Sequence, residues 1–240
     1  MLQAENLSYG VRTAMGKPTG FRITNVNFRL GQGYLMVLLG KNGSGKTTLL
    51  RLLFGLYQPE TGEVLWNGRN FSGAGEMAKS DIRRDIAYVG EEDIFFRQKS
   101  IGENAEYFGD FYPDFQFKVF REILEEFDTD TKLLEKTLEE LSTGEKKQVQ
   151  LAFVLARRPK LLILDEPGAN LDAVFRVSLM ERIQKQIAED KLSVIISTHI
   201  LEDVEDIADY VAVMEGGNME FFGDRDRFFE WMGKEQGVWK

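Results

Sequence analysis

One segment restricts the fold of this chain more than any other: the glycine-rich loop Gly40–Thr47, which directly follows an apolar run from Tyr34 to Leu39. Its residues match the pattern G-x-x-x-x-G-K-[ST], and a helical pattern from Lys46 to Phe54 continues from it. In the order strand, loop, helix, the glycines let backbone N–H groups wrap around phosphates, and the helix N-terminus adds the positive end of its dipole. A glycine-rich turn that matches by accident is the simpler interpretation, but it does not explain this order.

The side chains at the end of this phosphate-binding loop carry its chemistry. Lys46 is expected to reach the β and γ phosphates of a nucleotide, and the Thr47 hydroxyl is expected to ligate Mg²⁺. The residues predicted to bind the nucleotide here are Gly40, Lys41, Asn42, Gly43, Ser44, Gly45, Lys46, Thr47 and Thr48. By itself the loop indicates only a P-loop nucleotide binder, because kinases and GTPases share it.

A pair of acids follows another apolar run, Leu161–Leu164. Strands deliver their C-terminal residues to the crevice in which open α/β sheets bind ligands. Asp165 is therefore a predicted Mg²⁺ ligand, and Glu166 is a predicted general base that polarises the attacking water. Two solvated acids at a strand end are the simpler interpretation, which the phosphate-binding loop earlier in the chain disfavours.

Short apolar runs alternate with helical patterns in this part of the chain. Continuous apolarity is typical of parallel strands that are covered on both faces. Strands are expected at Tyr34–Leu39, Leu161–Leu164, Val194–Ile196 and Tyr210–Met214, and helices at Lys46–Phe54, Ser142–Ala156 and Phe175–Glu189. The alternation predicts an α/β fold.

Two regions depart from this alternation. Shorter strands are expected around Leu7–Tyr9, Ile23–Leu30 and Val64–Trp66, and they predict an N-terminal antiparallel β-subdomain. The acidic, aromatic-rich stretch Gly102–Glu140 has a helical pattern and predicts a helical subdomain, inserted at about residues 92–158. We place the main domain at residues 1–223 and an amphipathic tail at 224–240, whose aromatic residues are expected to pack on their own domain.

Composition excludes several classes of function. The formal net charge of -9 disfavours a dedicated nucleic-acid binder and a polybasic lipid anchor, since both depend on lysine and arginine. No cysteine is present, so disulfides and thiolate metal sites are excluded. The sequence shows neither a secretory signal nor a membrane-spanning stretch, and we expect a cytoplasmic protein whose membrane role depends on a partner.

The segment Leu141–Glu145 distinguishes among P-loop classes. Ser142 and Glu145 are spaced as a capping box, and they predict a helix that ends near Arg157. An ordinary capped helix is the simpler interpretation of these residues. In the order phosphate-binding loop, capped helix start, acid pair, however, the chain resembles the ATP-binding-cassette (ABC) family from Tyr9 to about Gly223, in which this helix start reads L-S-G-G-Q.

The resemblance implies further roles. It places Tyr9 where an aromatic ring stacks on the adenine of ATP, and His199, the single histidine of the sequence, at the switch position that contacts the γ-phosphate. It places Asn170, Leu171 and Asp172 in the D-loop, and it makes Ser142, Thr143, Gly144 and Glu145 the signature that meets ATP bound to the opposite subunit.

Four positions depart from the family pattern. The signature has Thr143 for glycine and Glu145 for glutamine, and Gly168 replaces a usual threonine or serine. Glu91 stands where the family usually has a glutamine that ligates Mg²⁺. A carboxylate can serve as this third metal ligand, but it adds a negative charge beside ATP.

The family resemblance implies ATP and Mg²⁺ as cofactors, a second ABC subunit, and a separate transmembrane permease on the inner face of the membrane. Phe95 or Phe96 is expected to contact the permease, and the run Gly90–Glu92 favours export over import. Two alternatives remain: a soluble ABC-type ATPase, and a regulatory module that no longer hydrolyses ATP.

Overall fold

The computed structural model of the chain describes residues 1–13, 15–167, 173–201 and 207–234. Its strands are β1 (Leu2–Arg12), β2 (Pro18–Leu30), β3 (Leu35–Leu39), β4 (Thr61–Trp66), β5 (Arg69–Asn70), β6 (Ile86–Val89), β7 (Leu161–Asp165), β8 (Ser193–Thr198), β9 (Tyr210–Glu215) and β10 (Asn218–Asp224). Its α-helices are α1 (Lys46–Leu53), α2 (Glu76–Asp85), α3 (Ile101–Gly109), α4 (Phe117–Glu126), α5 (Thr143–Ala156), α6 (Ala173–Asp190) and α8 (Arg225–Lys234). Two 3-10 turns are η1 (Thr131–Glu135) and η2 (Leu138–Glu140).

The predicted strands and helices are confirmed, and the N-terminal strands are longer than the sequence indicates. Helix α2 is not evident from the sequence because it is polar along most of its length and buries only Ile82. Strand β6 has four residues, which is too short for a periodic signal.

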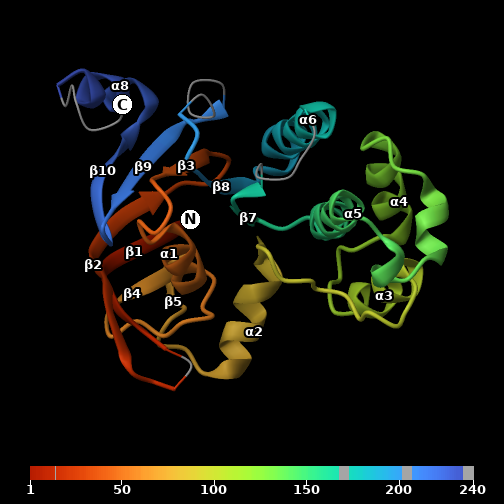
Figure 1. Cartoon of the computed structure of the whole chain (residues 1–240), viewed down its shortest axis with the longest axis horizontal. Helices are drawn as coiled ribbons and strands as arrows, with labels where there is room; N and C mark the ends of the chain where they lie inside the picture. The colour runs from red at the N-terminus through yellow and green to blue at the C-terminus, as the bar shows by residue number, and fades with distance from the viewer. Residues whose placement is uncertain (14, 168–172, 202–206, 235–240) are drawn as a thin grey trace.

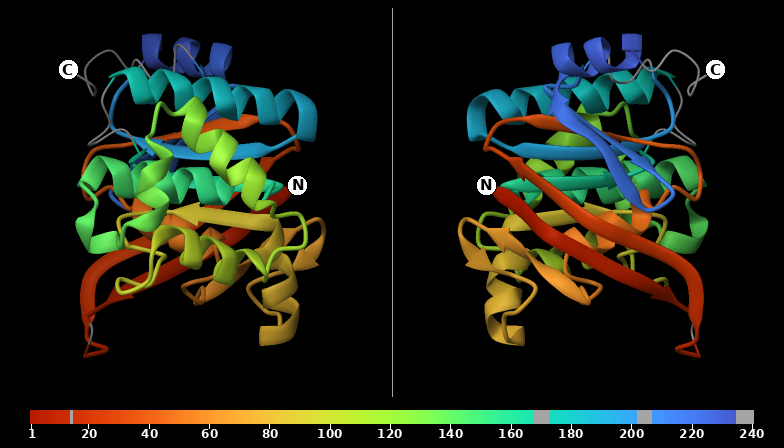
Figure 2. Two further views of the ribbon diagram at one scale, coloured as in Figure 1. Left: turned by 90° about the vertical axis from the view of Figure 1, so that its right-hand side faces the viewer. Right: turned by 90° about the vertical axis from the view of Figure 1, so that its left-hand side faces the viewer.

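In the described residues the ten strands form one mixed sheet, in the order β5-β4-β1-β2-β10-β9-β3-β8-β7-β6. The strands β6, β7, β8, β3 and β9 are parallel, whereas β1, β2, β4 and β5 pair antiparallel. One parallel pair, Asn218 with Thr24, connects the two parts through β10 and β2. Helix α1 lies between the antiparallel and the parallel strands (Figure 1), and α6 and α8 lie at the opposite end of the molecule from α2 (Figure 2).

Strand β3 shows how both faces of the parallel part are filled. All five of its residues are buried. Because side chains alternate along a strand, Leu35, Val37 and Leu39 pack with residues of α5 and α6, while Met36 and Leu38 pack with α1 and the antiparallel strands. The phosphate-binding loop therefore leaves the sheet from a strand that is held on both sides.

The parallel strands end at one edge of the sheet. Register pairs Leu39 at the end of β3 with Thr198 of β8, and Asp165 at the end of β7 with Ser197. Val89 at the end of β6 pairs with Leu164. Residues that follow these strands thus meet along a single line, which is where ligands of open α/β sheets bind.

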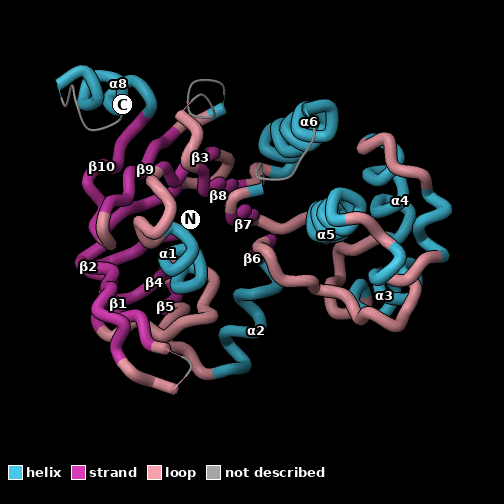
Figure 3. Tube along the Cα trace, in the orientation of Figure 1, coloured by secondary structure: helices cyan, strands magenta, loops and turns pink. Residues whose placement is uncertain are grey.

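Helices α3, α4 and α5 gather beside β6 and β7, away from the antiparallel strands (Figures 1 and 3). Arg157 connects α5 to the sheet: its buried guanidinium lies 3.5 Å from the centroid of the Tyr112 ring, and Nη2 donates to the carbonyl oxygens of Arg83 and Ile86. Burial lowers the pKa of Arg157 to about 10.

The C-terminal helix α8 packs on the sheet through Phe228, which is fully buried. Its ring centroid lies 5.8 Å from that of Phe221 in β10. This agrees with the expectation that the tail aromatics pack on their own domain. Across the helices of the described ranges, none combines the length and the apolarity that crossing a membrane requires.

Candidate functional site

The phosphate-binding loop has a backbone that only glycine adopts without strain. Gly43 and Gly45 have φ angles of 80° and 109°. At Gly45 an added Cβ would also come within 2.7 Å of Ile23 Cδ1 and 3.0 Å of Phe21 Cζ. The second strand of the N-terminal hairpin therefore packs directly against the turn that begins α1, and a larger residue at position 45 would displace the loop.

Lys46 lies at the centre of the loop. Its side chain is 3% exposed, and Nζ donates to the carbonyl oxygens of Gly40 at 2.7 Å and Lys41 at 3.3 Å. Nζ also forms an ion pair with Glu166 Oε1 at 3.0 Å. The loop thus closes around one ammonium group, which the acid at the end of β7 neutralises.

Asp165 accepts hydrogen bonds from three hydroxyls on three elements. Thr47 Oγ1 donates to Oδ1 at 3.2 Å, Ser197 Oγ donates to Oδ1 at 2.8 Å, and Tyr88 Oη donates to Oδ2 at 3.0 Å. Burial, followed by the nearby charge of Asp165, raises the pKa of Tyr88 to about 12, so this phenol remains a donor. A carboxylate next to a threonine hydroxyl fits Mg²⁺, which prefers oxygen ligands.

Glu166 turns out of strand β7 through an unusual backbone. Its φ angle is 46°, in the left-handed region, and its backbone N–H donates to Ser197 Oγ at 2.9 Å. Such a conformation in a residue other than glycine costs about 1–3 kcal/mol and is concentrated at functional sites. The turn directs the carboxylate toward Lys46 on one side and toward His199 on the other, whose Nδ1 is 3.8 Å from Oε2. The His199 side chain is half-exposed.

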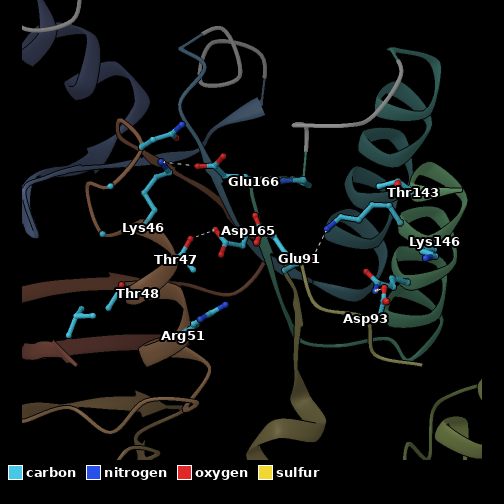
Figure 4. A pocket seen from close by; sticks show the side chains of 18 of the residues that line it. Lys46, Thr47, Thr48, Arg51, Glu91, Asp93, Thr143, Lys146, Asp165 and Glu166 are labelled. Carbon is cyan, nitrogen blue, oxygen red and sulfur yellow. Dashed lines mark hydrogen bonds and ion pairs between the residues drawn. The ribbon is translucent and has the colours of Figure 1, made fainter. Parts of the chain in front are cut away.

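Lys46, Thr47, Asp165 and Glu166 line a cavity of about 870 Å³, which is large enough for a nucleotide, whereas the predicted switch residue His199 is not part of its lining. Figure 4 shows Lys46, Thr47 and Thr48 on one side, Thr143 and Lys146 of α5 on the other, and Asp165, Glu166 and Glu91 between them. The complete lining is Val11, Phe21, Asn42, Gly43, Gly45, Lys46, Thr47, Thr48, Arg51, Gly90, Glu91, Asp93, Thr143, Lys146, Lys147, Gln150, Asp165, Glu166 and Pro167.

The predicted adenine contact, Tyr9, does not line this cavity. Its ring stacks on Tyr57, with centroids 5.2 Å apart and an interplanar angle of 10°. The hairpin residues that reach the cavity are Val11 and Phe21. They carry no sequence motif, and their place beside the loop follows from the packing of the hairpin on Gly45.

The predicted capping box of α5 is confirmed. Glu145 N donates to Ser142 Oγ at 3.2 Å, and Ser142 N donates to Glu145 Oε2 at 2.8 Å. These bonds lower the pKa of Glu145. The departure from glutamine thus gives α5 a charged N-terminal cap, and of the four predicted signature residues only Thr143 lines the cavity.

The predicted metal ligand Glu91 follows β6 and lines the cavity beside Asp165. Lys147, Gln150 and Arg51 also lie there, although none carries a recognised motif. Tyr88 and Ser197 belong to strands β6 and β8, so strand register could have placed them near Asp165. The predicted D-loop residues Asn170, Leu171 and Asp172, together with Gly168, lie outside the described residues.

A family model described as "ABC transporter" matches residues 23–169. The energy-coupling factor transporter ATP-binding protein EcfA2 of Ligilactobacillus salivarius (strain UCC118) is 32% identical over 234 residues, covering 91% of this chain and 77% of that protein. The sulfate/thiosulfate import ATP-binding protein CysA of Bradyrhizobium diazoefficiens is 32% identical over 215 residues, covering 87% of this chain and 61% of that protein. A solved structure of an ATP-binding subunit of an ABC transporter has a TM-score of 0.83 at 26% identity, covering 99% of this chain and 95% of that one.

The mixed sheet, the phosphate-binding loop and the acid pair define a P-loop nucleotide-hydrolysing protein. The chain belongs to the ABC transporter family, as an ATP-binding subunit with ATPase activity. ATP with Mg²⁺ is the nucleotide of this family.

Proposed function

We propose that the chain hydrolyses ATP in the described cavity with Glu166 as general base, and that two ABC subunits close around two ATP molecules to drive a separate transmembrane permease. The observation that carries this proposal is the convergence of Lys46, Asp165 and Glu166 at the carboxyl edge of the parallel strands. A cation for phosphates, a carboxylate for metal and a carboxylate for water are the groups that ATP hydrolysis requires.

In the proposed mechanism the phosphates compete with Glu166 for the Lys46 ammonium. Pairing of Lys46 with phosphate frees the Glu166 carboxylate to accept a proton from the attacking water. To His199, whose Nδ1 lies 3.8 Å from Glu166 Oε2, we assign contact with the γ-phosphate. Mg²⁺, when bound, neutralises charge on the phosphates, and Thr47, Asp165 and Glu91 would hold it.

The second subunit completes the site. The N-terminal turn of α5 is exposed at Ser142 and Thr143, and a helix N-terminus attracts anions. We assign Ser142, Thr143, Gly144 and Glu145 to the ATP held by the opposite subunit, and Asn170, Leu171 and Asp172 to the link between the two sites. The helical segment at about 92–158 would move as a unit relative to the rest of domain 1–223.

An aromatic patch on the helical segment suits a permease. Phe96, Tyr107 and Phe111 are 46%, 49% and 56% exposed, and their rings form a continuous series with centroids 5.6 Å and 5.8 Å apart. Phe95, the alternative contact candidate, is buried between Phe108 and Phe153. Exposed aromatic groups of this kind mark interaction sites, so we assign the patch to a cytoplasmic helix of the permease and the chain to the inner membrane face.

The direction of transport is a separate matter. Export, which the sequence favours, has no support among the reported relatives, and the bradyrhizobial relative is named as an import protein. No side chain of the cavity distinguishes import from export. The substrate, likewise, is chosen by the permease and not by this chain. The proposal therefore assigns the ATP-hydrolysing role to this chain and the direction to its permease.

The test compares Mg²⁺-dependent phosphate release by the wild type and Glu166→Gln, with size-exclusion chromatography in ATP. We expect turnover to fall by at least about 10²-fold, as for loss of a general base, and the variant to elute as an ATP-bound dimer. Glu181→Gln, an exposed substitution on α6, is the matched control. A wild type that binds ATP but neither hydrolyses it nor dimerises would contradict the proposal and favour a regulatory module.

The aromatic patch has its own test. The double variant Tyr107→Ser/Phe111→Ser should keep its basal ATPase activity and lose binding to vesicles that contain the cognate permease. Unchanged binding would exclude the patch as the docking surface.

A further inference from the structure

Glu91 brings a carboxylate to a place where the ABC pattern has a neutral amide, next to a polyanionic substrate. Among the described residues, the carboxylates that line the cavity are Glu91, Asp93, Asp165 and Glu166, and the cations are Lys46, Arg51, Lys146 and Lys147. Four negative and four positive side chains balance before ATP enters. A cation of the lining that faces Glu91 would offset its charge.

Lys147 has the geometry for this role. It projects from α5 across the cavity, and Nζ donates to the carbonyl oxygen of Gly90, the residue before Glu91, at 2.9 Å. Burial lowers the pKa of Lys147, while the charges of Asp165 and Glu91 act in the opposite direction. The ammonium is thus partly withdrawn from water and close enough to both carboxylates to interact with them.

Two of the other three cations, Lys46 and Arg51, are bound to other groups. Lys46 is paired with Glu166 and with the carbonyl oxygens of its own loop. Arg51 Nη1 donates to Tyr57 Oη at 3.0 Å, and Nη2 lies 3.5 Å from Glu92 Oε1. Lys147 is the lysine bonded to the backbone of the segment that carries Glu91.

A second contact holds the same segment to α5. Gln150, one turn beyond Lys147 and 4% exposed, donates through Nε2 to the carbonyl oxygen of Glu92 at 3.2 Å and to Asp93 Oδ1 at 3.5 Å. Residues three positions apart share one face of a helix. Successive turns of the helix that begins with the signature therefore hold the backbone of residues 90–93.

We propose that Lys147 is the charge partner of Glu91: it offsets the extra carboxylate at the nucleotide cavity, and its bond to Gly90 positions Glu91 toward bound Mg²⁺-ATP. This inference rests on the proposed nucleotide site. It explains how the chain retains a glutamate at this position, because the helix that presents the signature also supplies the compensating cation.

The test is a charge-rescue cycle that compares the wild type with Lys147→Gln, Glu91→Gln and the double variant. Equilibrium binding of ATP is measured by calorimetry with and without Mg²⁺, and turnover is measured separately. Lys147→Gln should raise the Kd for ATP about tenfold, since it leaves one carboxylate uncompensated in a partly desolvated cavity. The double variant should return to within about threefold of the wild type, because both charges are then absent.

Lys118→Gln is the matched control, since Lys118 lies on α4 with a side chain that is 85% exposed. Melting temperatures verify that each variant is folded. If the double variant binds ATP no better than Lys147→Gln, the charge partnership is overturned. A wild type that binds ATP without hydrolysing it would contradict the role of Glu166 as general base. The binding measurements on the four proteins would still test the partnership of Lys147 with Glu91.

Discussion

The two walls of the nucleotide cavity are built differently. The first wall consists of the phosphate-binding loop and the ends of β7 and β8, where Lys46 and Asp165 are buried and each is held by several partners. The second wall consists of α5 and residues 90–93, and this segment is held to α5 by single bonds such as that from Lys147 to Gly90. Beyond this wall lie the exposed aromatic side chains of the helical segment.

This difference separates the groups that act on the phosphates from the part of the site that can transmit the nucleotide state to a partner. Sheet register fixes the groups that act on phosphate, because adjacent parallel strands cannot shift without breaking a buried ladder. Within the second wall, residues 90–93 are held to α5 by a few polar side chains, so this segment can change position at small cost while the first wall keeps its geometry. A subunit that transmits the state of its nucleotide to a partner needs both properties.

The largest effect is expected from the first wall. Lys46→Ala should lower ATPase activity about 10³-fold, because it removes the cation that faces the phosphates and leaves Glu166 without its partner. Phosphate release checks the prediction, and Lys118→Ala is the exposed control. Activity within tenfold of the wild type would show that another cation binds the phosphates.

Tyr88→Phe tests how Asp165 is positioned. The variant keeps the ring that stacks on Phe54 but loses the hydroxyl that donates to Asp165 Oδ2. A hydrogen bond to a charged group contributes about 1.5–3 kcal/mol, so we expect turnover to fall about tenfold and the Mg²⁺ requirement to rise. Tyr112→Phe, which lies under Arg157 instead, should leave the Mg²⁺ requirement unchanged. An unaltered Mg²⁺ titration for Tyr88→Phe would show that Thr47 and Ser197 suffice.

Phe21 and Tyr9 are the two candidates for the residue that contacts the adenine ring of ATP. Because Phe21 lines the cavity and Tyr9 stacks on Tyr57, Phe21→Ala should raise the Kd for ATP about tenfold, in line with the ~1–3 kcal/mol of base stacking. Tyr9→Ala should lower the melting temperature and change the Kd little. The reverse pattern would restore the assignment of Tyr9 that the family resemblance implies.

The smallest effect is expected at the cap of α5. The bonds from Ser142 lower the folded-state pKa of Glu145, so its contribution to stability is present above the unfolded pKa and is lost as pH falls through the folded value. Glu145→Ala should therefore be less stable than the wild type at pH 7, by at most about 1 kcal/mol after solvent screening. Thermal melts from pH 7 to pH 3 should show the two proteins converging in acid, whereas the exposed control Glu122→Gln should parallel the wild type. A difference that persists at pH 3 would contradict the charged cap.

Local patterns in the sequence determined most of the fold and the first wall. A phosphate-binding loop needs glycines at fixed places and a buried strand before it, so Gly43, Gly45 and Lys46 are recognisable without coordinates. The acids at the end of β7 are also recognisable, because residues that directly follow a buried parallel strand lie at the edge of the sheet where ligands bind.

The second wall was decided by tertiary structure. Lys147 is a helical lysine like many others until packing places α5 beside residue 90, and Phe21 is an ordinary strand residue until β2 pairs with β1 over Gly45. The choice between Phe95 and Phe96 likewise depended on which ring the helices α3 and α5 enclose. These contacts join residues that are distant in the chain, and periodicity and motif spacing carry no information about such pairs, because their geometry arises only when the layers pack.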